Sequence, residues 1–430
     1  MSLLLSNCKL FTHNGRINGD VLVGEDGKIA KIGHNLTADK TINLHGKLLL
    51  PGLIDPHVHL RDPGQTNKED FYTGTCAAIA GGVTTILDMP NNSPPIISQR
   101  RLDEKKAVAK AKAVCDYGFH IGATDTNAVE ADSSTAVALK LYMGSTTGDL
   151  LVESESSLEN IFSTFKRTIV VHAEDNKCIK EASAGVFHTA ENHNKMRPPK
   201  CAEISLAKAV HFAQKHSAKL HVAHMSTGGE VELVKTAKKD GLRVSCEVTP
   251  QHLFLTEEAT REKGNFARLN PPLRTKSDQA ALWQNLSFVD CIATDHAPHT
   301  IEEKQKPYDE APSGLPGLET TLPLLLDAYS KKRISLEAIV RLTSFGAAQI
   351  FGLVNKGQIA AGFDADFVVV DLEKETKVEN GDLWTKCNWS PFDGMKLKGA
   401  VAQTFLRGEE AFDGENICLK QGSGKNVKWE

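Results

Sequence analysis

Eight apolar, strand-like runs alternate with amphipathic stretches through the middle of the chain. The stretches Gln99–Val114, Ala202–Lys215 and Gly229–Asp240 place their apolar residues at helical spacing. Eight strands with intervening helices are the count of a closed (β/α)8 barrel. An open doubly wound sheet is disfavoured because no glycine-rich phosphate loop follows an early strand. The eight runs are Leu53–His59, Val83–Asp88, Tyr117–Gly122, Val137–Met143, Thr168–Ala173, Lys219–Met225, Leu242–Val248 and Val289–Asp295.

A different, β-like pattern occupies both ends of the chain. Residues 3–50 alternate apolar and polar positions between Asn-Gly and Asp-Gly turn signals, and the same texture returns from about Gly357. We therefore expect residues 1–50 and 356–430 to build one small β-sandwich domain together. Residues 51–355 are expected to form the barrel.

Composition excludes several functional classes. Lys and Arg number 50 against 54 Asp and Glu, so there is no basic excess to bind nucleic acid. A hydrophobic fraction of 40% excludes a disordered chain. The apolar run Phe71–Leu87 is short and contains glycines, and the first ten residues lack a basic segment, so neither a membrane span nor a signal peptide is expected. These features predict a soluble, cytoplasmic protein.

The cysteines give a weaker signal. Nine are scattered along the chain, none of them in a CxxC pair, and several lie in apolar runs. An odd number without paired spacing predicts buried, reduced thiols rather than a disulfide framework or a cysteine-type zinc site.

Reactive side chains gather at or near the C-terminal ends of the predicted strands, where barrel active sites lie. A single strand histidine is more often a hydrogen-bonded core residue than a metal ligand. Four histidines and an aspartate at four strand ends are harder to explain as packing, because burying them unpartnered would cost on the order of several kcal/mol. A divalent ion would satisfy them together. The residues are His57 and His59 on one strand, which share a face, and His172, His224 and Asp295.

Lys140 is the remaining candidate, on the fourth predicted strand. Its ammonium would repel a cation in the same cavity, so one interpretation has the side chain extending out of the barrel end. The alternative is that carbon dioxide adds to the neutral amine. The resulting carbamate would be an anionic ligand long enough to bridge two metal ions.

Six motifs together resemble the cyclic-amidohydrolase branch of the amidohydrolase superfamily, and within it the dihydroorotases: IDPHVHLRDPG, KLYMG, VVHAED, HVAHMST, NPPLR and TDHAPH. The resemblance covers nearly the whole chain. HxH is shared by many amidohydrolases, whereas Arg61, Asn91 of MPNN and the NPPLR segment are more specific. Many long bacterial dihydroorotases carry an aspartate bridge in a DDG-type motif. The KLYMG strand is closer to the multifunctional animal enzyme and to dihydropyrimidinases.

The resemblance implies a two-metal site. Zinc is the expected metal, although cobalt or manganese would also suit histidine and carboxylate ligands. Asp295 is expected to take the proton of the attacking water and to pass it to the leaving nitrogen, with the roles reversed on cyclisation. The resemblance assigns His57, His59 and Asp295 to one ion, His172 and His224 to the other, and a carbamylated Lys140 to the bridge.

The substrate pair that the resemblance implies, N-carbamoyl-L-aspartate and L-dihydroorotate, carries an α-carboxylate. Arg61, two residues beyond the HxH pair, can hold it through two parallel hydrogen bonds. Asn91 can donate to the same carboxylate, and the resemblance assigns His299 there as well. Asn270 and the backbone at Gly314 look like contacts to the ring amide. The alternative for Arg61 is a surface salt bridge with the neighbouring Asp62 or Glu69.

The predicted function is therefore the reversible, metal-dependent cyclisation of N-carbamoyl-L-aspartate to L-dihydroorotate in pyrimidine biosynthesis. One rival is a dihydropyrimidinase, hydantoinase or allantoinase, whose substrates lack the ring carboxylate and give no reason for Arg61. The other is an inactive scaffold, which typically loses metal ligands, whereas every position here is filled. We expect a small-molecule substrate and neither a nucleic acid nor a membrane partner. Homodimer formation is left open.

Overall fold

The computed structural model describes residues 1–12, 15–145 and 150–430. Its centre is an eight-stranded parallel sheet in which the strands follow their order in the chain. The ring closes because the His59 backbone N–H donates to the His296 carbonyl oxygen (2.8 Å), beside a parallel bridge from Val58 to His296. The predicted (β/α)8 barrel is confirmed. Its strands are β6 (Leu53–Val58), β7 (Val83–Asp88), β8 (Asp116–Gly122), β9 (Ala138–Tyr142), β10 (Thr168–His172), β11 (Lys219–Val222), β12 (Val244–Val248) and β13 (Cys291–Ile292).

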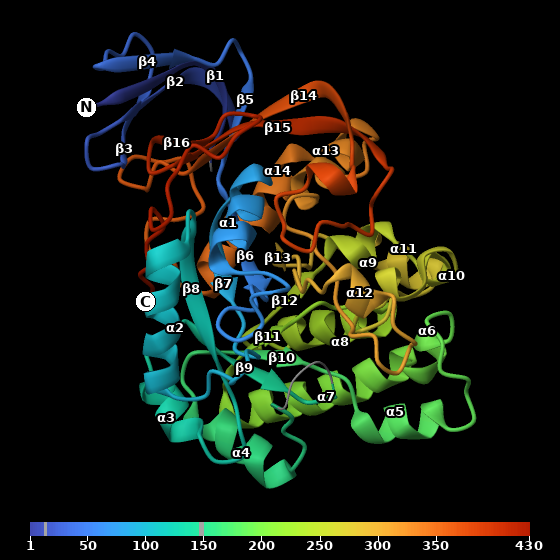
Figure 1. Cartoon of the computed structure of the whole chain (residues 1–430). Coiled ribbons are helices and arrows are strands. Elements are labelled where there is room, and N and C mark those ends of the chain that lie inside the picture. Colours follow the sequence, from blue (N-terminus) through green and yellow to red (C-terminus); the bar gives the residue numbers. More distant parts are fainter. Residues whose placement is uncertain (13–14, 146–149) are drawn as a thin grey trace.

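Helices follow the barrel strands in the chain and cover the outside of the ring (Figure 1). None of the described helices combines the length and the apolar character that crossing a membrane requires. The helices are α1 (Phe71–Ala80), α2 (Gln99–Lys112), α3 (Ala128–Ser133), α4 (Glu155–Thr164), α5 (Asn176–Ser183), α6 (His193–Met196), α7 (Pro199–His216), α8 (Gly228–Lys239), α9 (Pro250–Phe254), α10 (Glu258–Lys263), η1 (Gly264–Ala267), α11 (Lys276–Gln284), α12 (Ile301–Lys304), α13 (Thr321–Ser330), α14 (Leu336–Val340), η2 (Arg341–Phe345), α15 (Gly346–Ile350) and η3 (Asn380–Asp382).

Local capping signals define where two of the three predicted helices begin. The three stretches with helical spacing form α2, α7 and α8. The Ser98 side chain accepts a hydrogen bond from the Arg101 backbone N–H at the start of α2. At the start of α8, Thr227 and Glu230 form a reciprocal capping box. These caps satisfy backbone N–H groups that no helical carbonyl can reach.

Strand alternation separates an apolar outer layer from a polar interior. On β9, Leu139 and Leu141 are fully buried in the hydrophobic core between the strands and the helices. The residue between them, Lys140, instead lines a cavity inside the barrel. This is the orientation that the alternation of a strand predicts, and it places polar side chains where the strands end.

The two ends of the chain meet in a second sheet, at the top of Figure 1. Strands from both termini pair directly, since Phe367 of β14 lies opposite Pro51 of β5 in an antiparallel ladder. The apolar side chains of this sheet form a core of their own, with Leu5, Leu10 and Phe405 fully buried. The predicted two-ended β unit is therefore present as one mixed sheet. Its strands are β1 (Leu3–Thr12), β2 (Gly15–Val23), β3 (Ile29–Gly33), β4 (Lys40–Asn43), β5 (Leu48–Pro51), β14 (Phe367–Lys377), β15 (Lys396–Leu406) and β16 (Glu409–Phe412).

The expectation that all cysteines are reduced is wrong for one pair. Cys178 on α5 and Cys201 on α7 form a disulfide, with their Cα atoms 5.4 Å apart. They are 23 residues apart in sequence. They meet because the segment that contains α6 brings the start of α7 back to α5. The spacing of the cysteines carries no trace of that return. The remaining cysteines are free, and Cys418 is the exposed one among them.

A buried ion cluster joins the barrel to the second sheet. Lys356 Nζ lies 2.6 Å from an oxygen of Asp116, at the start of β8, and 2.6 Å from one of Asp366, just before β14. Asp364 is 3.0 Å away, and the Arg407 guanidinium pairs with Asp116 from the other side. Burial lowers the pKa of Lys356, but the carboxylates outweigh burial and hold it above its usual value. The lysine therefore stays charged and neutralises the acids.

Replacing this lysine tests the cluster. Because Lys356→Met would leave buried carboxylates without their cation, we expect the free energy of unfolding to fall by about 3–5 kcal/mol. Urea denaturation at neutral pH measures the change. Lys377→Met, which removes one side of the exposed pair with Glu379, is the control and should leave the unfolding midpoint unchanged. Equal midpoints for both variants would contradict the role of the cluster.

Candidate active site

A cavity lies inside the barrel at the C-terminal ends of the strands. All the site residues predicted from the sequence line it, with the exception of His299. Three further lining residues, Tyr142, Ala297 and Ser313, were not predicted. The predicted residues brought together here are His57, His59, Arg61, Asn91, Lys140, His172, His224, Asn270, Asp295 and Gly314.

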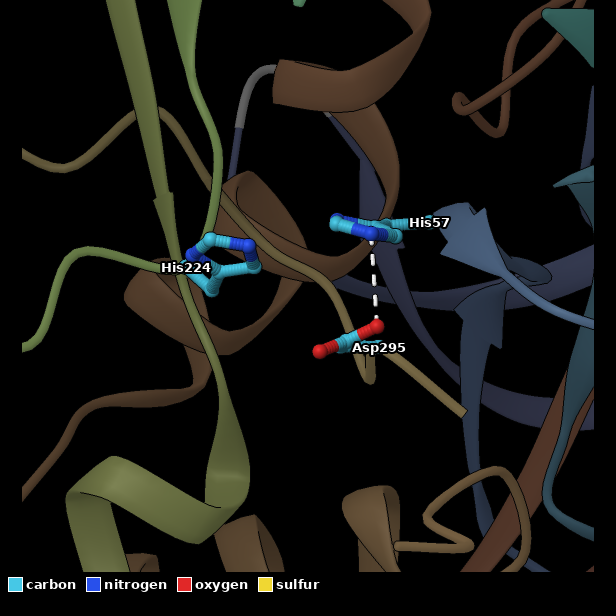
Figure 2. A group of neighbouring side chains, drawn as sticks. All are labelled: His57, His224 and Asp295. Atoms are coloured by element: carbon cyan, nitrogen blue, oxygen red, sulfur yellow. Dashed lines mark ion pairs between the residues drawn. The ribbon is translucent and has the colours of Figure 1, made fainter. Parts of the chain in front are cut away.

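Three of these side chains form a group that could hold a metal ion. One ligand atom each of His57, His224 and Asp295 lies within 4.8 Å of the other two, and Figure 2 shows the three side chains converging. Asp295 Oδ1 is 3.3 Å from His57 Nε2 and 2.9 Å from His59 Nε2. Imidazole nitrogens and carboxylate oxygens are the donors that zinc prefers. The donor set therefore fits a divalent cation.

The second pair of histidines shares one member, His224, with this group. His172 Nδ1 and His224 Nε2 are 3.0 Å apart. His172 is the last residue of β10, and His224 lies just beyond the end of β11. Burial lowers the pKa of His172 and holds that of His224 well below its usual range. Both rings are therefore neutral at pH 7, the form that ligates metals. Among the described residues, His224 Nδ1 has no hydrogen-bond partner.

Lys140 contributes a further unpartnered atom to the site. Its side chain is fully buried, and its Nζ has no hydrogen-bond partner within the described parts of the chain. The amine lies 5.2 Å from the centre of the Tyr142 ring. Burial lowers its pKa to about 8, so about a tenth of the amine is neutral at pH 7, far more than for an exposed lysine. The alternative in which this side chain leaves the barrel end is wrong.

The backbone is strained at three site residues. Arg61, His224 and Asp295 have φ angles of 62°, 36° and 46°, in the left-handed region that non-glycine residues rarely adopt. Each lies two or three residues beyond the end of a barrel strand, where the chain turns away from the sheet. Such conformations cost on the order of 1–3 kcal/mol each and persist where surrounding contacts hold them. They place these side chains firmly over the cavity.

Glu247 on β12 contacts residues of two histidine-bearing strands, and the sequence motifs did not identify it. Its carboxylate lies 2.5 Å from His57 Nδ1 and 3.0 Å from His221 Nε2, and accepts the His224 backbone N–H at 3.1 Å. Burial raises the pKa of Glu247, but the two imidazoles hold it well below the usual range. The carboxylate therefore keeps the proton of His57 on Nδ1 and leaves Nε2 free to bind a metal.

Arg61 is buried, and its direct hydrogen-bond partners are neutral groups. Its Nε donates to the Pro298 carbonyl oxygen at 3.2 Å, and its Nη2 lies 3.1 Å from His299 Nε2. The predicted alternative, a salt bridge to Asp62 or Glu69, is wrong. Asp62 pairs with Lys112 and Glu69 accepts from the Thr385 hydroxyl. Arg61 makes no salt bridge with any carboxylate in the described ranges.

Of the other predicted substrate residues, Asn91, Asn270 and Gly314 line the cavity, whereas His299 does not. Asn91 Oδ1 lies 2.6 Å from His59 Nδ1, and Asn270 Oδ1 lies 2.9 Å from His193 Nε2. At Gly314, with φ of 141°, an added Cβ would lie 2.4 Å from the Ala297 carbonyl oxygen, so the loop requires glycine. His299 sits behind Arg61 instead of lining the cavity. Its ring nitrogens contact Arg61 Nη2, Lys68 Nζ and the Ser313 carbonyl oxygen.

Comparisons with known proteins agree with this geometry. The model of the amidohydrolase family matches residues 48–411. The dihydroorotase of Pyrococcus abyssi is 37% identical over 420 residues, covering 97% of each chain, and that of Methanothermobacter thermautotrophicus is 36% identical over 98% of this chain and 97% of its own. The solved structure of an L-hydantoinase from Arthrobacter aurescens superposes with a TM-score of 0.95, at 30% identity and 99% coverage of both chains.

The chain belongs to the amidohydrolase family. Within that family its place is among the dihydroorotases, to which several relatives at 34–38% identity belong over nearly the full chain. The resemblance drawn from the sequence motifs is thereby confirmed.

Changing Glu247 tests its hold on the histidines. In Glu247→Gln the side-chain amide cannot accept from both imidazoles, so we expect metal affinity to fall by about 10- to 100-fold. The measurement is zinc bound per chain at fixed free zinc. Glu319→Gln is a matched control, because Glu319 accepts backbone N–H groups of Trp384 and Thr385 away from the cavity and burial raises its pKa to about 8. Unchanged zinc affinity in Glu247→Gln would refute the assignment.

Proposed function

We infer that the chain catalyses the reversible cyclisation of N-carbamoyl-L-aspartate to L-dihydroorotate, a step of pyrimidine biosynthesis. The observation that carries this proposal is the state of Arg61, a buried guanidinium that lacks a carboxylate partner in the described chain and lines the same cavity as the histidines. Both substrates carry an α-carboxylate, which can supply that partner through two parallel hydrogen bonds. Dihydroorotase relatives at 36–37% identity support the same conclusion.

The cavity is proposed to hold two divalent ions, with zinc as the expected metal. His57, His59 and Asp295 would bind one ion, and His172 with His224 would bind the other. Lys140, as its carbamate, would bridge them. The unpartnered Lys140 Nζ and His224 Nδ1 support this assignment. When bound, such ions polarise an amide carbonyl and lower the pKa of a water.

Asp295 is proposed as the group that moves the proton. Burial raises the pKa of Asp295, but the neighbouring His57, His59 and His224 outweigh it and hold the pKa far below its usual value. The carboxylate is therefore ionised at neutral pH and can accept the proton of the attacking water. It then gives that proton to the ring nitrogen as the amide bond breaks. In cyclisation it takes the proton from the ureido nitrogen instead.

The remaining residues are proposed to orient the substrate. Arg61 and Asn91 bind the α-carboxylate, and His299, in contact with Arg61, completes that clamp. Asn270 and the backbone at Gly314 would face the ring amide and hydrogen-bond to its edge. Together they hold the reacting carbonyl between the metal ligands and the carboxylate clamp.

We further propose a division of labour along the chain. Residues 51–355 carry the chemistry, and residues 1–50 and 356–430 support the barrel as the β domain built from both termini. The enzyme is proposed to act in the cytoplasm on a small-molecule substrate, without a nucleic acid or membrane partner. Homodimer formation stays a prediction.

A hydantoinase-type activity is the rival with a specific observation behind it. The likeness to the L-hydantoinase structure extends over 99% of the chain. Hydantoin and dihydrouracil have no ring carboxylate, however, and would leave the Arg61 guanidinium buried without a counter-ion. That cost favours dihydroorotate as the substrate.

Arg61→Met distinguishes these substrates. Because it removes the charged partner of the α-carboxylate, we expect kcat/KM for dihydroorotate to fall by about two to three orders of magnitude. Metal content should stay that of the unmodified protein. Activity is followed as ring opening of dihydroorotate, with dihydrouracil and hydantoin in parallel. The proposal is wrong if the unmodified protein turns over either of these faster than dihydroorotate.

Lys140→Ala tests the bridging ligand. Without the amine no carbamate forms, so we expect loss of one of the two ions and of nearly all turnover. Metal per chain and ring-opening rate are measured together. Addition of a short carboxylic acid with zinc should restore part of the rate, because a free carboxylate can take the place of the carbamate. Two ions per chain with normal turnover would show that the site needs no bridge from Lys140.

A further inference from the structure

A lysine outside the cavity is connected to both sides of the carboxylate clamp. Lys105 lies on α2, the helix that covers the outer side of the barrel beside β8 (Figure 1). Its side chain is fully buried. A fully buried lysine is rare because its ammonium loses its hydration, and it is found where other groups bind it.

Three oxygens bind the Lys105 ammonium, and they belong to the last residue of β7 and the segment that follows it. Asp88 Oδ2 lies 2.6 Å from Nζ, the Met89 carbonyl oxygen 2.7 Å and Asn92 Oδ1 2.8 Å. The segment between Met89 and Asn92 contains Asn91, the proposed carboxylate ligand. Lys105 therefore holds the chain on both sides of Asn91, through the backbone at Met89 and through the side chain at Asn92.

The same ion pair reaches the other half of the clamp. The second carboxylate oxygen of Asp88, Oδ1, accepts the Leu60 backbone N–H at 2.8 Å. Leu60 lies between His59 and Arg61. The Asn92 side chain donates to the Pro63 carbonyl oxygen at 3.3 Å, two residues beyond Arg61. The segment after β7 is thus tied to the segment after β6 at two points on either side of Arg61.

We propose that Lys105, through Asp88 and Asn92, is a positioning residue that sets the distance between Arg61 and Asn91 and so tunes recognition of the substrate α-carboxylate. This inference rests on the proposed function. Two segments from different strands must present their donors to one small anion, and a misplacement of about 1 Å at such a site can cost about 100-fold in rate. A purely structural ion pair would stabilise the fold without affecting carboxylate recognition.

The test compares substrate recognition with stability. In Lys105→Met the three contacts to the segment after β7 are lost, and we expect KM for dihydroorotate to rise by about tenfold or more with metal content unchanged. Because that variant leaves Asp88 buried without a cation, Lys105→Met with Asp88→Asn is the second variant. This double variant has no buried charge at either position and keeps an acceptor for the Leu60 N–H. It still lacks the lysine contacts to Met89 and Asn92.

Lys356→Met is the matched control, since it also removes a buried lysine from a carboxylate cluster but has its partners outside the cavity. Its KM for dihydroorotate should equal that of the unmodified protein. Combined with Arg61→Met, the Lys105 substitution should add little further loss, because both act on one interaction.

A KM within twofold of the unmodified value in the folded Lys105 variants would overturn the positioning role while leaving the proposed function intact. The same would follow from an equal rise in Lys356→Met, or from failure of both Lys105 variants to fold, since the pair would then be structural. Absence of dihydroorotate turnover by the unmodified protein would instead overturn the proposed function, and the inference with it.

Discussion

Closure of the barrel between its first and last strands is the constraint on which the site depends. The His59 N–H to His296 carbonyl hydrogen bond (2.8 Å) joins strand ends that are more than 200 residues apart in the chain. His57 and His59 come from one side of this seam and Asp295 from the other. The contact of 2.9 Å between His59 and Asp295 exists because the ring is closed. The terminal sheet and its buried Lys356 cluster attach to the same ring at the start of β8.

Much of the fold and the cavity could be predicted because both follow from local patterns. Each barrel strand is an apolar run with a clear end, and the C-terminal ends of such strands converge in any closed barrel. Lys140 could be placed inside because Leu139 and Leu141 must face the helices. What could not be predicted depends on contacts between distant residues. Glu247 is 190 residues from His57, and an acid within an apolar strand carries no mark of which ring it will meet. The Cys178–Cys201 disulfide depends in the same way on a return of the chain.

Backbone conformation was equally hidden from the sequence. Arg61, His224 and Asp295 adopt left-handed conformations without the glycine that usually signals them. Their neighbours hold them there: the His224 N–H donates to Glu247, and the Leu60 N–H, next to Arg61, donates to Asp88. Buried carboxylates outside the cavity thus stabilise the turns that aim side chains into it. This explains why the carboxylates that position the site, Glu247 and Asp88, lie outside the cavity, behind the residues that the motifs identify.

The cavity separates two kinds of electrostatic recognition. On one side, neutral imidazoles and an ionised aspartate form a donor set suited to cations. On the other, Arg61 is buried, and burial lowers its pKa without removing its charge. A desolvated guanidinium bound by neutral oxygen and nitrogen acceptors retains most of the cost of leaving water. An entering carboxylate offsets that cost, whereas a ring without one leaves it in place. We therefore propose that the discrimination between carboxylated and plain cyclic amides resides in how the cavity holds Arg61, with no change in the barrel shared with the hydantoinase.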